Sequence, residues 1–263
     1  GRWQGRESGK YPFWSPDGRS VGFSVGVQIK RVDLDSGSVR LVASADVPLG
    51  GTWNRNGTIL FDNGPGSSLY RVSAEGGAAT EVNNGKLSEL DPWFPHFLPD
   101  QRHFLFYGAG TVPGTYVAEL DGPDRPRLIG SAVAVAERVV VGQGFGGGAV
   151  SVPTAGRIVY RTGPSGAQSQ FIRFDRSGRV LETVAGSDNG DGYNSSLSPD
   201  RRYLAMSRTV RGTSDLWVSD LSRGVGTRFT SDPTFELMPV WSPDGRRMAY
   251  TRDPKRADGT RHF

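Results

Sequence analysis

Short apolar segments separated by polar turn residues recur along the whole sequence. Those that directly follow a turn span residues 20–25, 58–61, 103–107, 157–160, 203–206 and 247–250. Segments of this length, bounded by Gly, Pro and Asp, are typical of β-strands. No stretch shows a sustained apolar period of about 3.6 residues between helix caps. The pattern therefore predicts an all-β protein.

A turn motif precedes these segments and occurs six times. Trp-Ser-Pro-Asp-Gly-Arg at 14–19 returns at 241–246, with weaker copies at 196–201 and 96–101 and degenerate copies at 52–57 and 151–156. In such a turn, proline presets φ, the Asp side chain bonds the backbone and Gly accepts a positive φ. Successive markers at 17, 56, 100, 155, 200 and 244 are 39, 44, 55, 45 and 44 residues apart. Repeats of about 40–45 residues are typical of propeller blades.

Each repeat has room for four strands. A third strand is expected after the apolar segment at 28–32, 69–72, 115–120, 170–174 and 216–221, and polar outer strands are expected at positions such as 38–42, 179–184 and 226–229. The sixth turn is not followed by a third and a fourth strand. The sequence therefore predicts a β-propeller of four-stranded blades, five complete and one partial.

These repeats resemble the WD-like blades of TolB-type six-bladed propellers. More narrowly, the chain resembles the propeller region that follows the kinase domain in some bacterial serine/threonine protein kinases. The matching stretches are 11–23, 51–77, 94–107, 171–178 and 197–247, the last of which contains Asp215-Leu216-Trp217. The resemblance covers nearly the whole chain and implies its architecture, but propellers host unrelated functions.

The resemblance implies a single β-propeller domain over residues 1–263, with departures. The chain has no Gly-rich loop with a strand lysine and no His-Arg-Asp loop, so no kinase domain is expected. The 55-residue spacing indicates a propeller shortened near Ala132–Val133, and the chain stops at Phe263 before the sixth blade is complete. We therefore expect a domain shortened near 132–133 and truncated at its C-terminus.

Incomplete blades leave strand edges with unpaired backbone donors and acceptors. Such edges favour pairing with another chain. We therefore expect a homodimer that completes the damaged blades by strand exchange or edge pairing. A closed monomer is the alternative if residues 1–10 supply the missing strand.

Charge and cysteine content narrow the classes of partner. The chain carries 31 Lys and Arg against 27 Asp and Glu, a net charge of +4, and its arginines are scattered rather than clustered. Nucleic-acid binding proteins concentrate positive charge on one face, so no nucleic-acid partner is expected. The absence of cysteine excludes disulfides and thiolate chemistry. No apolar run is long enough to span a membrane. The sequence does not decide the cellular location, and an extracytoplasmic location in a bacterium is one of the alternatives.

The segments that lead into the inner strands should converge on the central channel of a propeller. There, Tyr11, Trp93 and Tyr193 could form an aromatic rim for a ligand. His96 follows Trp93 on the same predicted strand and is a further candidate for ligand binding, with a packed histidine as the alternative. A solvated polar funnel is the alternative for the whole channel mouth.

Oxygen-bearing residues in the same segments suggest a cation site. Asp91, Asp191, Asn194 and Glu236 could surround a divalent cation such as calcium, which takes about 6–8 oxygen ligands. The segment 188–192 superficially resembles the start of an EF-hand loop, but the closing Glu and the flanking helices are missing. The Asp of each Pro-Asp-Gly turn recurs once per repeat, which indicates a structural role.

Two functions remain open. The chain has no Gly-X-Ser-X-Gly elbow and only three histidines, which argues against a Ser-His-Asp triad. The first hypothesis is therefore a module that binds a small molecule or a protein at the channel mouth. The alternative is a metal-dependent hydrolase of esters, lactones or phosphotriesters, in which a channel-bound cation polarises the substrate or activates water.

Overall fold

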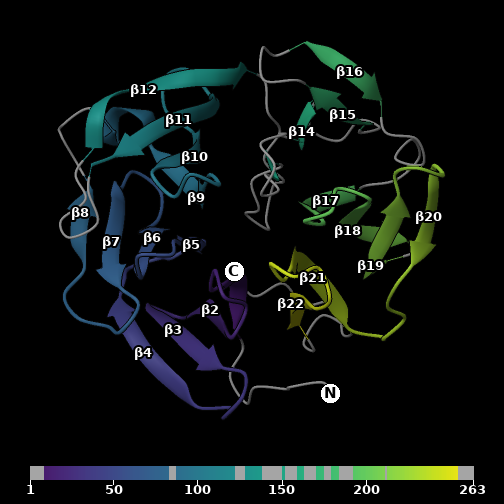
Figure 1. Cartoon of the computed structure of the whole chain (residues 1–263), viewed down its shortest axis with the longest axis horizontal. Helices are drawn as coiled ribbons and strands as arrows, with labels where there is room; N and C mark the ends of the chain where they lie inside the picture. The colour runs from purple at the N-terminus through teal and green to yellow at the C-terminus, as the bar shows by residue number, and fades with distance from the viewer. Residues whose placement is uncertain are drawn as a thin grey trace. The chain divides into compact units, whose positions relative to one another are not determined.

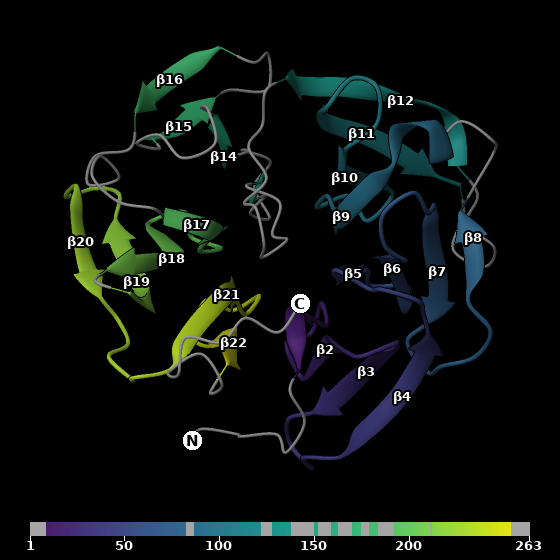
Figure 2. The same ribbon diagram turned by 180° about the vertical axis from the view of Figure 1, so that it is seen from behind.

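The computed structural model describes residues 9–82, 87–121, 128–137, 150–151, 159–162, 170–174, 179–183, 192–210 and 212–253. The chain divides into two compact units, Gly1–Val139 and Val140–Phe263. Each unit is described by itself. Figures 1 and 2 show the sheets of both units from opposite sides.

The first unit contains three four-stranded antiparallel sheets, each in simple sequence order within the described residues. The first is formed by β1 (Lys10–Trp14), β2 (Ser20–Val25), β3 (Gln28–Asp33) and β4 (Val39–Ser44). The second is formed by β5 (Gly51–Trp53), β6 (Thr58–Asp62), β7 (Leu69–Ser73) and β8 (Thr80–Val82). The third is formed by β9 (Pro92–Phe97), β10 (His103–Gly108), β11 (Gly114–Leu120) and β12 (Leu128–Glu137). A 3-10 helix, η1 (Ser88–Leu90), precedes β9.

The second unit repeats this arrangement. One sheet is formed by β13 (Val150–Ser151), β14 (Val159–Thr162), β15 (Gln170–Phe174) and β16 (Val180–Thr183). The next is formed by β17 (Gly192–Leu197), β18 (Tyr203–Val210), β19 (Thr213–Asp220) and β20 (Val225–Arg228). A two-stranded sheet is formed by β21 (Phe235–Trp241) and β22 (Met248–Asp253). The expected all-β fold with four-stranded blades is confirmed.

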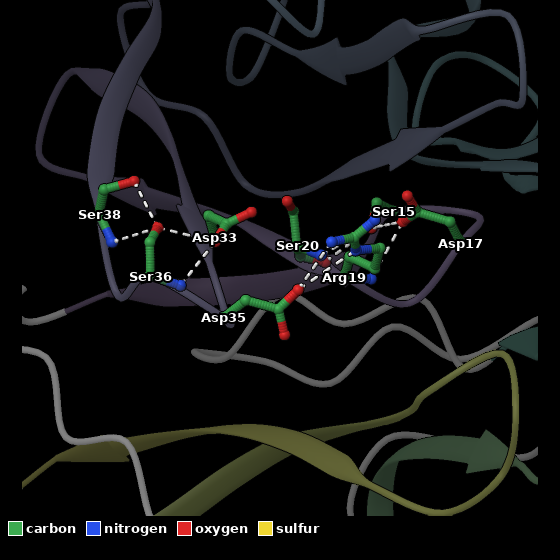
Figure 3. A network of polar contacts seen from close by, with 8 residues as sticks. All are labelled: Ser15, Asp17, Arg19, Ser20, Asp33, Asp35, Ser36 and Ser38. Carbon is green, nitrogen blue, oxygen red and sulfur yellow. Dashed lines mark hydrogen bonds and ion pairs between the residues drawn. The ribbon is translucent and has the colours of Figure 1, made fainter.

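The repeated turns form as their sequence predicts. Ser15 donates its hydroxyl hydrogen to Asp17 over 2.6 Å, and the backbone N–H groups of Arg19 and Ser20 donate to the Asp17 carboxylate and the Ser15 hydroxyl, respectively. Figure 3 shows this network together with Asp33, Asp35, Ser36 and Ser38 of the turn between β3 and β4. The hydrogen bonds from Ser15, first, and from the backbone of Arg19 lower the pKa of Asp17. The Asp therefore has the structural role that its recurrence indicated.

Two other turns repeat this Ser-to-Asp bond in the second unit. The hydroxyls of Ser198 and Ser242 each donate over 2.5 Å, to Asp200 and Asp244. In both turns the same serine oxygen accepts a backbone N–H five residues ahead. A local motif of this kind connects the first and second strands of a blade without long-range help.

The core lies between adjacent sheets. In the first unit, one buried cluster joins the first and second sheets through Phe13, Ile29, Ile59 and Phe61. A Cβ atom on Gly51 would lie only 2.8 Å from the Phe13 ring, so this glycine allows the close approach of the two sheets. A second cluster, which includes Leu60, Leu69, Phe104, Phe106 and Tyr116, joins the second and third sheets.

The expected shortening near 132–133 and the expected truncation at the C-terminus stay predictions. Ala132 and Val133 lie inside the ten-residue strand β12, which is the edge of the third sheet. Residues 1–8 and 254–263 lie outside the described residues. In the part of the chain that the structure describes, no helix is long and apolar enough to cross a membrane.

Candidate functional site

Four inner strands contain a residue in the left-handed backbone region. These residues are Tyr11, Phe94, Asn194 and Met238, with φ values of 54°, 54°, 52° and 57°. Each lies at or next to an irregularity in strand pairing, in β1, β9, β17 and β21. Left-handed backbone costs about 1–3 kcal/mol for a residue other than glycine and is concentrated at functional sites. The sequence analysis did not predict these bulges.

In the first unit, the left-handed residues bring aromatic side chains together. Gly50 lies between them, because a Cβ atom built on it would be 3.7 Å from Cδ1 of Phe94 and 4.0 Å from Cβ of Tyr11. Trp93 meets Phe94 edge to face, with ring centroids 6.0 Å apart and an interplanar angle of 88°. Tyr11, Trp93 and Phe94 are all half-buried. We call these three side chains the aromatic cluster.

Asp91 holds one side of the aromatic cluster. Its Oδ1 accepts the indole N–H of Trp93 at 2.8 Å and the backbone N–H of Gly66 at 2.7 Å. Asp91 itself has φ 46° and ends η1. The residue that was expected to bind a cation therefore fixes the orientation of the neighbouring tryptophan.

Asp62 holds the other side and was missed by the sequence analysis. Its side chain is fully buried. It accepts the backbone N–H of Leu49 at 2.7 Å and that of Phe94 at 2.9 Å. Burial raises the pKa of Asp62 to about 7; its backbone hydrogen bonds oppose the shift, and the charge of Asp91 adds to it. Burial, with the charge of Asp62, also raises the pKa of Tyr11 to about 12.

The second unit places two expected metal ligands in buried positions. Asn194 is buried, and neither atom of its amide has a hydrogen-bond partner among the described residues. Glu236 is fully buried, and burial, with the charges of Asp232 and Asp215, raises its pKa. The hydroxyls of Thr230 and Tyr250 act in the opposite direction, although neither oxygen of Glu236 accepts a hydrogen bond from the part of the chain that the structure describes.

The predicted site residues are divided between the two units. Tyr11, Asp91, Trp93 and His96 belong to the first unit, where His96 is half-buried on β9 opposite Leu105. Tyr193, Asn194 and Glu236 belong to the second unit, and Asp191 lies outside the described residues. Among the residues that are described, no three His, Asp or Glu side chains form a group that could hold a metal ion. The full ligand-binding set and the calcium set stay predictions.

Comparisons with known proteins support the fold. No family model matches the sequence, and neither does any curated protein. The putative TolB of Agrobacterium tumefaciens is similar in structure, with a TM-score of 0.72, 18% identity and coverage of 96% of this chain and 92% of that one. TolB of Acinetobacter baumannii has a TM-score of 0.67 and 17% identity over 91% of this chain, which spans 58% of that protein.

A gluconolactonase from Xanthomonas campestris has the same type of fold. Its TM-score is 0.66 at 14% identity, over 94% of this chain and 84% of that one. Identities this low establish architecture and leave chemistry open. The chain therefore has a TolB-like β-propeller fold, and the narrower resemblance to kinase-associated propellers stays a prediction.

Proposed function

We propose that this chain is a binding module whose ligand, a small molecule or a segment of a protein, contacts the aromatic cluster. The observation that carries the proposal is the grouping of the aromatic cluster: Tyr11 and Phe94, both on left-handed backbone, lie close to Gly50, and Trp93 packs against Phe94. Half-buried aromatic rings offer a large apolar contact area at a small cost in conformational entropy. Backbone strain at the same positions is typical of ligand sites.

The hydrogen bonds of two carboxylates support this proposal, because they fix the cluster before any ligand arrives. Asp91 fixes the Trp93 indole, and Asp62 fixes the backbone of Phe94. A site that is rigid in advance loses less entropy on binding. The aromatic cluster is therefore suited to recognition by shape and apolar contact.

Fluorine NMR on protein labelled with 5-fluorotryptophan tests the proposal. The chain has six tryptophans, and Trp93→Phe assigns the resonance of interest. Against a library of small soluble fragments, we expect the fragments that bind to shift the Trp93 resonance and to leave that of Trp217 in place. Binding without any change at Trp93, or a library without a single binder, would contradict the proposal.

Matched variants then locate the binding surface. Tyr11→Asn and Phe94→Asn each remove an aromatic ring. The asparagine that replaces it tolerates left-handed backbone and occupies such a position at residue 194. Each should weaken fragment binding by about tenfold, or roughly 1.4 kcal/mol. Phe229→Ala, at an exposed aromatic of the second unit, is the control and should change nothing.

The hydrolase alternative makes a different prediction for the same protein. D-Glucono-1,5-lactone and an aryl phosphotriester serve as substrates, with calcium and then with a chelator. A binding module should give no turnover above the blank in either condition. If turnover is seen and is lost both on chelation and in Glu236→Gln, the hydrolase replaces the binding proposal. The same result would favour the calcium site.

We infer further that the sheets represent five complete blades and part of a sixth. We also infer that two copies of the chain form a homodimer. The five four-stranded sheets and the two-stranded sheet of the described residues support the first inference. Exposed Ile129, Val133 and Val135 on the edge strand β12 support the second, because an edge strand with no charged residue before its last position, Glu137, invites pairing. Light scattering should give twice 28.4 kDa, and Val133→Lys should return the mass to 28.4 kDa. A monomer at micromolar concentration would refute the dimer.

A further inference from the structure

Asp62 connects three segments of the first unit through one buried carboxylate. It is the last residue of β6, and its side chain is 0% exposed. Oδ1 accepts the N–H of Leu49, which precedes β5, and Oδ2 accepts the N–H of Phe94 on β9. The backbone of Gly64, in the loop after β6, also favours the ionised form and so opposes the rise in the pKa of Asp62. The carboxylate therefore links the second sheet to the inner strand of the third.

A neutral group makes the corresponding link in the second unit. Ser207 on β18 is also fully buried, and its hydroxyl oxygen accepts the N–H of Met238 at 3.1 Å. Phe94 and Met238 are both left-handed residues of the next inner strand. A hydroxyl therefore suffices for this backbone contact, and the carboxylate at position 62 adds an ionisable group that the contact does not need.

The ionisable groups around Asp62 belong to several elements. The charge of Asp91, which follows η1, acts on Asp62, and Asp62 in turn acts on Tyr11 of β1. Of the strands packed against β6, β5 carries no ionisable side chain, β7 carries Tyr70 and Arg71, and β9 carries His96. A buried carboxylate beside another acid favours its neutral form, whereas hydrogen bonds from N–H groups favour the charged form.

We propose that Asp62 is a pH-responsive clasp that gains one proton below neutral pH and then holds Leu49 and Phe94 less firmly. When the carboxylate is ionised, both oxygens accept charge-assisted hydrogen bonds, which are about twice as strong as neutral ones. When a proton from water binds one oxygen, that oxygen becomes an O–H donor and a poorer acceptor. The N–H group that faces it then loses its charge-assisted bond.

The consequence of protonation reaches the aromatic cluster. Phe94 is held by Asp62 through its backbone, and its ring lies close to Gly50, as does Cβ of Tyr11. Loosening this bond lets the left-handed residue relax, because its strained backbone persists only while surrounding contacts enforce it. The clasp therefore makes the order of the aromatic cluster depend on pH, whether or not a ligand binds there.

Amide NMR on the full chain without ligand tests the clasp. In a titration from about pH 5 to about pH 9, the amide protons of Leu49 and Phe94 should move upfield on acidification with one shared midpoint near 7. The amide of Met238, which bonds the Ser207 hydroxyl, is the internal control and should not titrate. His96→Gln removes the imidazole of β9 and should leave the shared midpoint unchanged.

Two outcomes would overturn the clasp. One is a wild-type titration in which the Leu49 and Phe94 amides stay fixed across the range, a result that needs no variant. The other is a midpoint that persists in Asp62→Asn, which keeps the shape and removes the ionisation, or in Asp62→Ser, which copies the arrangement at Ser207. Neither measurement involves a ligand, so the clasp and the binding proposal fail independently.

Discussion

At two junctions between neighbouring sheets, a buried side-chain oxygen accepts a backbone N–H from the next inner strand, but the two oxygens belong to different chemical groups. At the junction of β6 and β9, the buried carboxylate of Asp62 accepts the N–H of a left-handed residue, Phe94. At the junction of β18 and β21, the buried hydroxyl of Ser207 accepts the N–H of a left-handed residue, Met238. The repeat thus requires an acceptor at this point and leaves its charge open. The ionisable acceptor lies in the unit where aromatic side chains gather.

The largest difference between the junctions should appear in the pH dependence of stability. The pKa of Asp62 is raised from 3.8 to about 7, so the folded chain binds this proton more tightly than the unfolded chain. The stability that this bound proton contributes to the folded state is fully present below about pH 4 and is lost as the pH rises through about 7. The shift corresponds to at most about 4 kcal/mol.

Urea unfolding of the wild type and of Asp62→Asn at several pH values measures this contribution. The wild type should lose stability relative to the variant between about pH 4 and about pH 7, and the difference should level off above that range. Ser207→Asn is the matched variant at the other junction and should run parallel to the wild type. Parallel curves for the wild type and Asp62→Asn would show that Asp62 does not titrate in the folded state.

Removing each acceptor altogether should have the next largest effect. Asp62→Ala leaves the half-buried N–H groups of Leu49 and Phe94 without their acceptor, whereas Ser207→Ala leaves only the buried N–H group of Met238 without one. Each unsatisfied buried group costs roughly 1–3 kcal/mol. We expect a loss of about 3 kcal/mol for Asp62→Ala and about 1 kcal/mol for Ser207→Ala at about pH 6, measured by urea unfolding. Equal losses would mean that Asp62 serves one N–H group in solution.

The two junctions also show which features can be predicted from sequence. The Pro-Asp-Gly turns were predicted because Ser15, Asp17 and Arg19 contact one another within a few residues. The bond between Asp91 and Trp93 is equally local, but both were candidates because they lie in the segment that enters an inner strand, and the bond itself was not predicted. Local chemistry that recurs in each repeat leaves a readable pattern.

Asp62 and Phe94 left no such pattern. They are 32 residues apart, and their contact exists only because one sheet packs against the next. The left-handed backbone of Phe94 is carried by a residue that does not favour it, so no glycine marks it in the sequence. An alignment of the second strands of the repeats could have drawn attention to Asp62, because Ser207 occupies the corresponding position in β18.

The smallest effect concerns a second contact that the two junctions share without a difference in charge. Thr52 accepts the N–H of Phe97 at 3.1 Å, and Ser196 accepts the N–H of Trp241 at 3.2 Å, and both hydroxyls are buried. Thr52→Val leaves the buried N–H group of Phe97 without its acceptor, and Ser196→Ala does the same to the half-buried N–H group of Trp241, so each should lower the free energy of unfolding by about 1 kcal/mol. Because neither hydroxyl ionises, both losses should stay constant from about pH 5 to about pH 9. Urea unfolding at both ends of that range measures them, and a loss at Thr52 that varies with pH would place the pH sensitivity of the first junction outside Asp62.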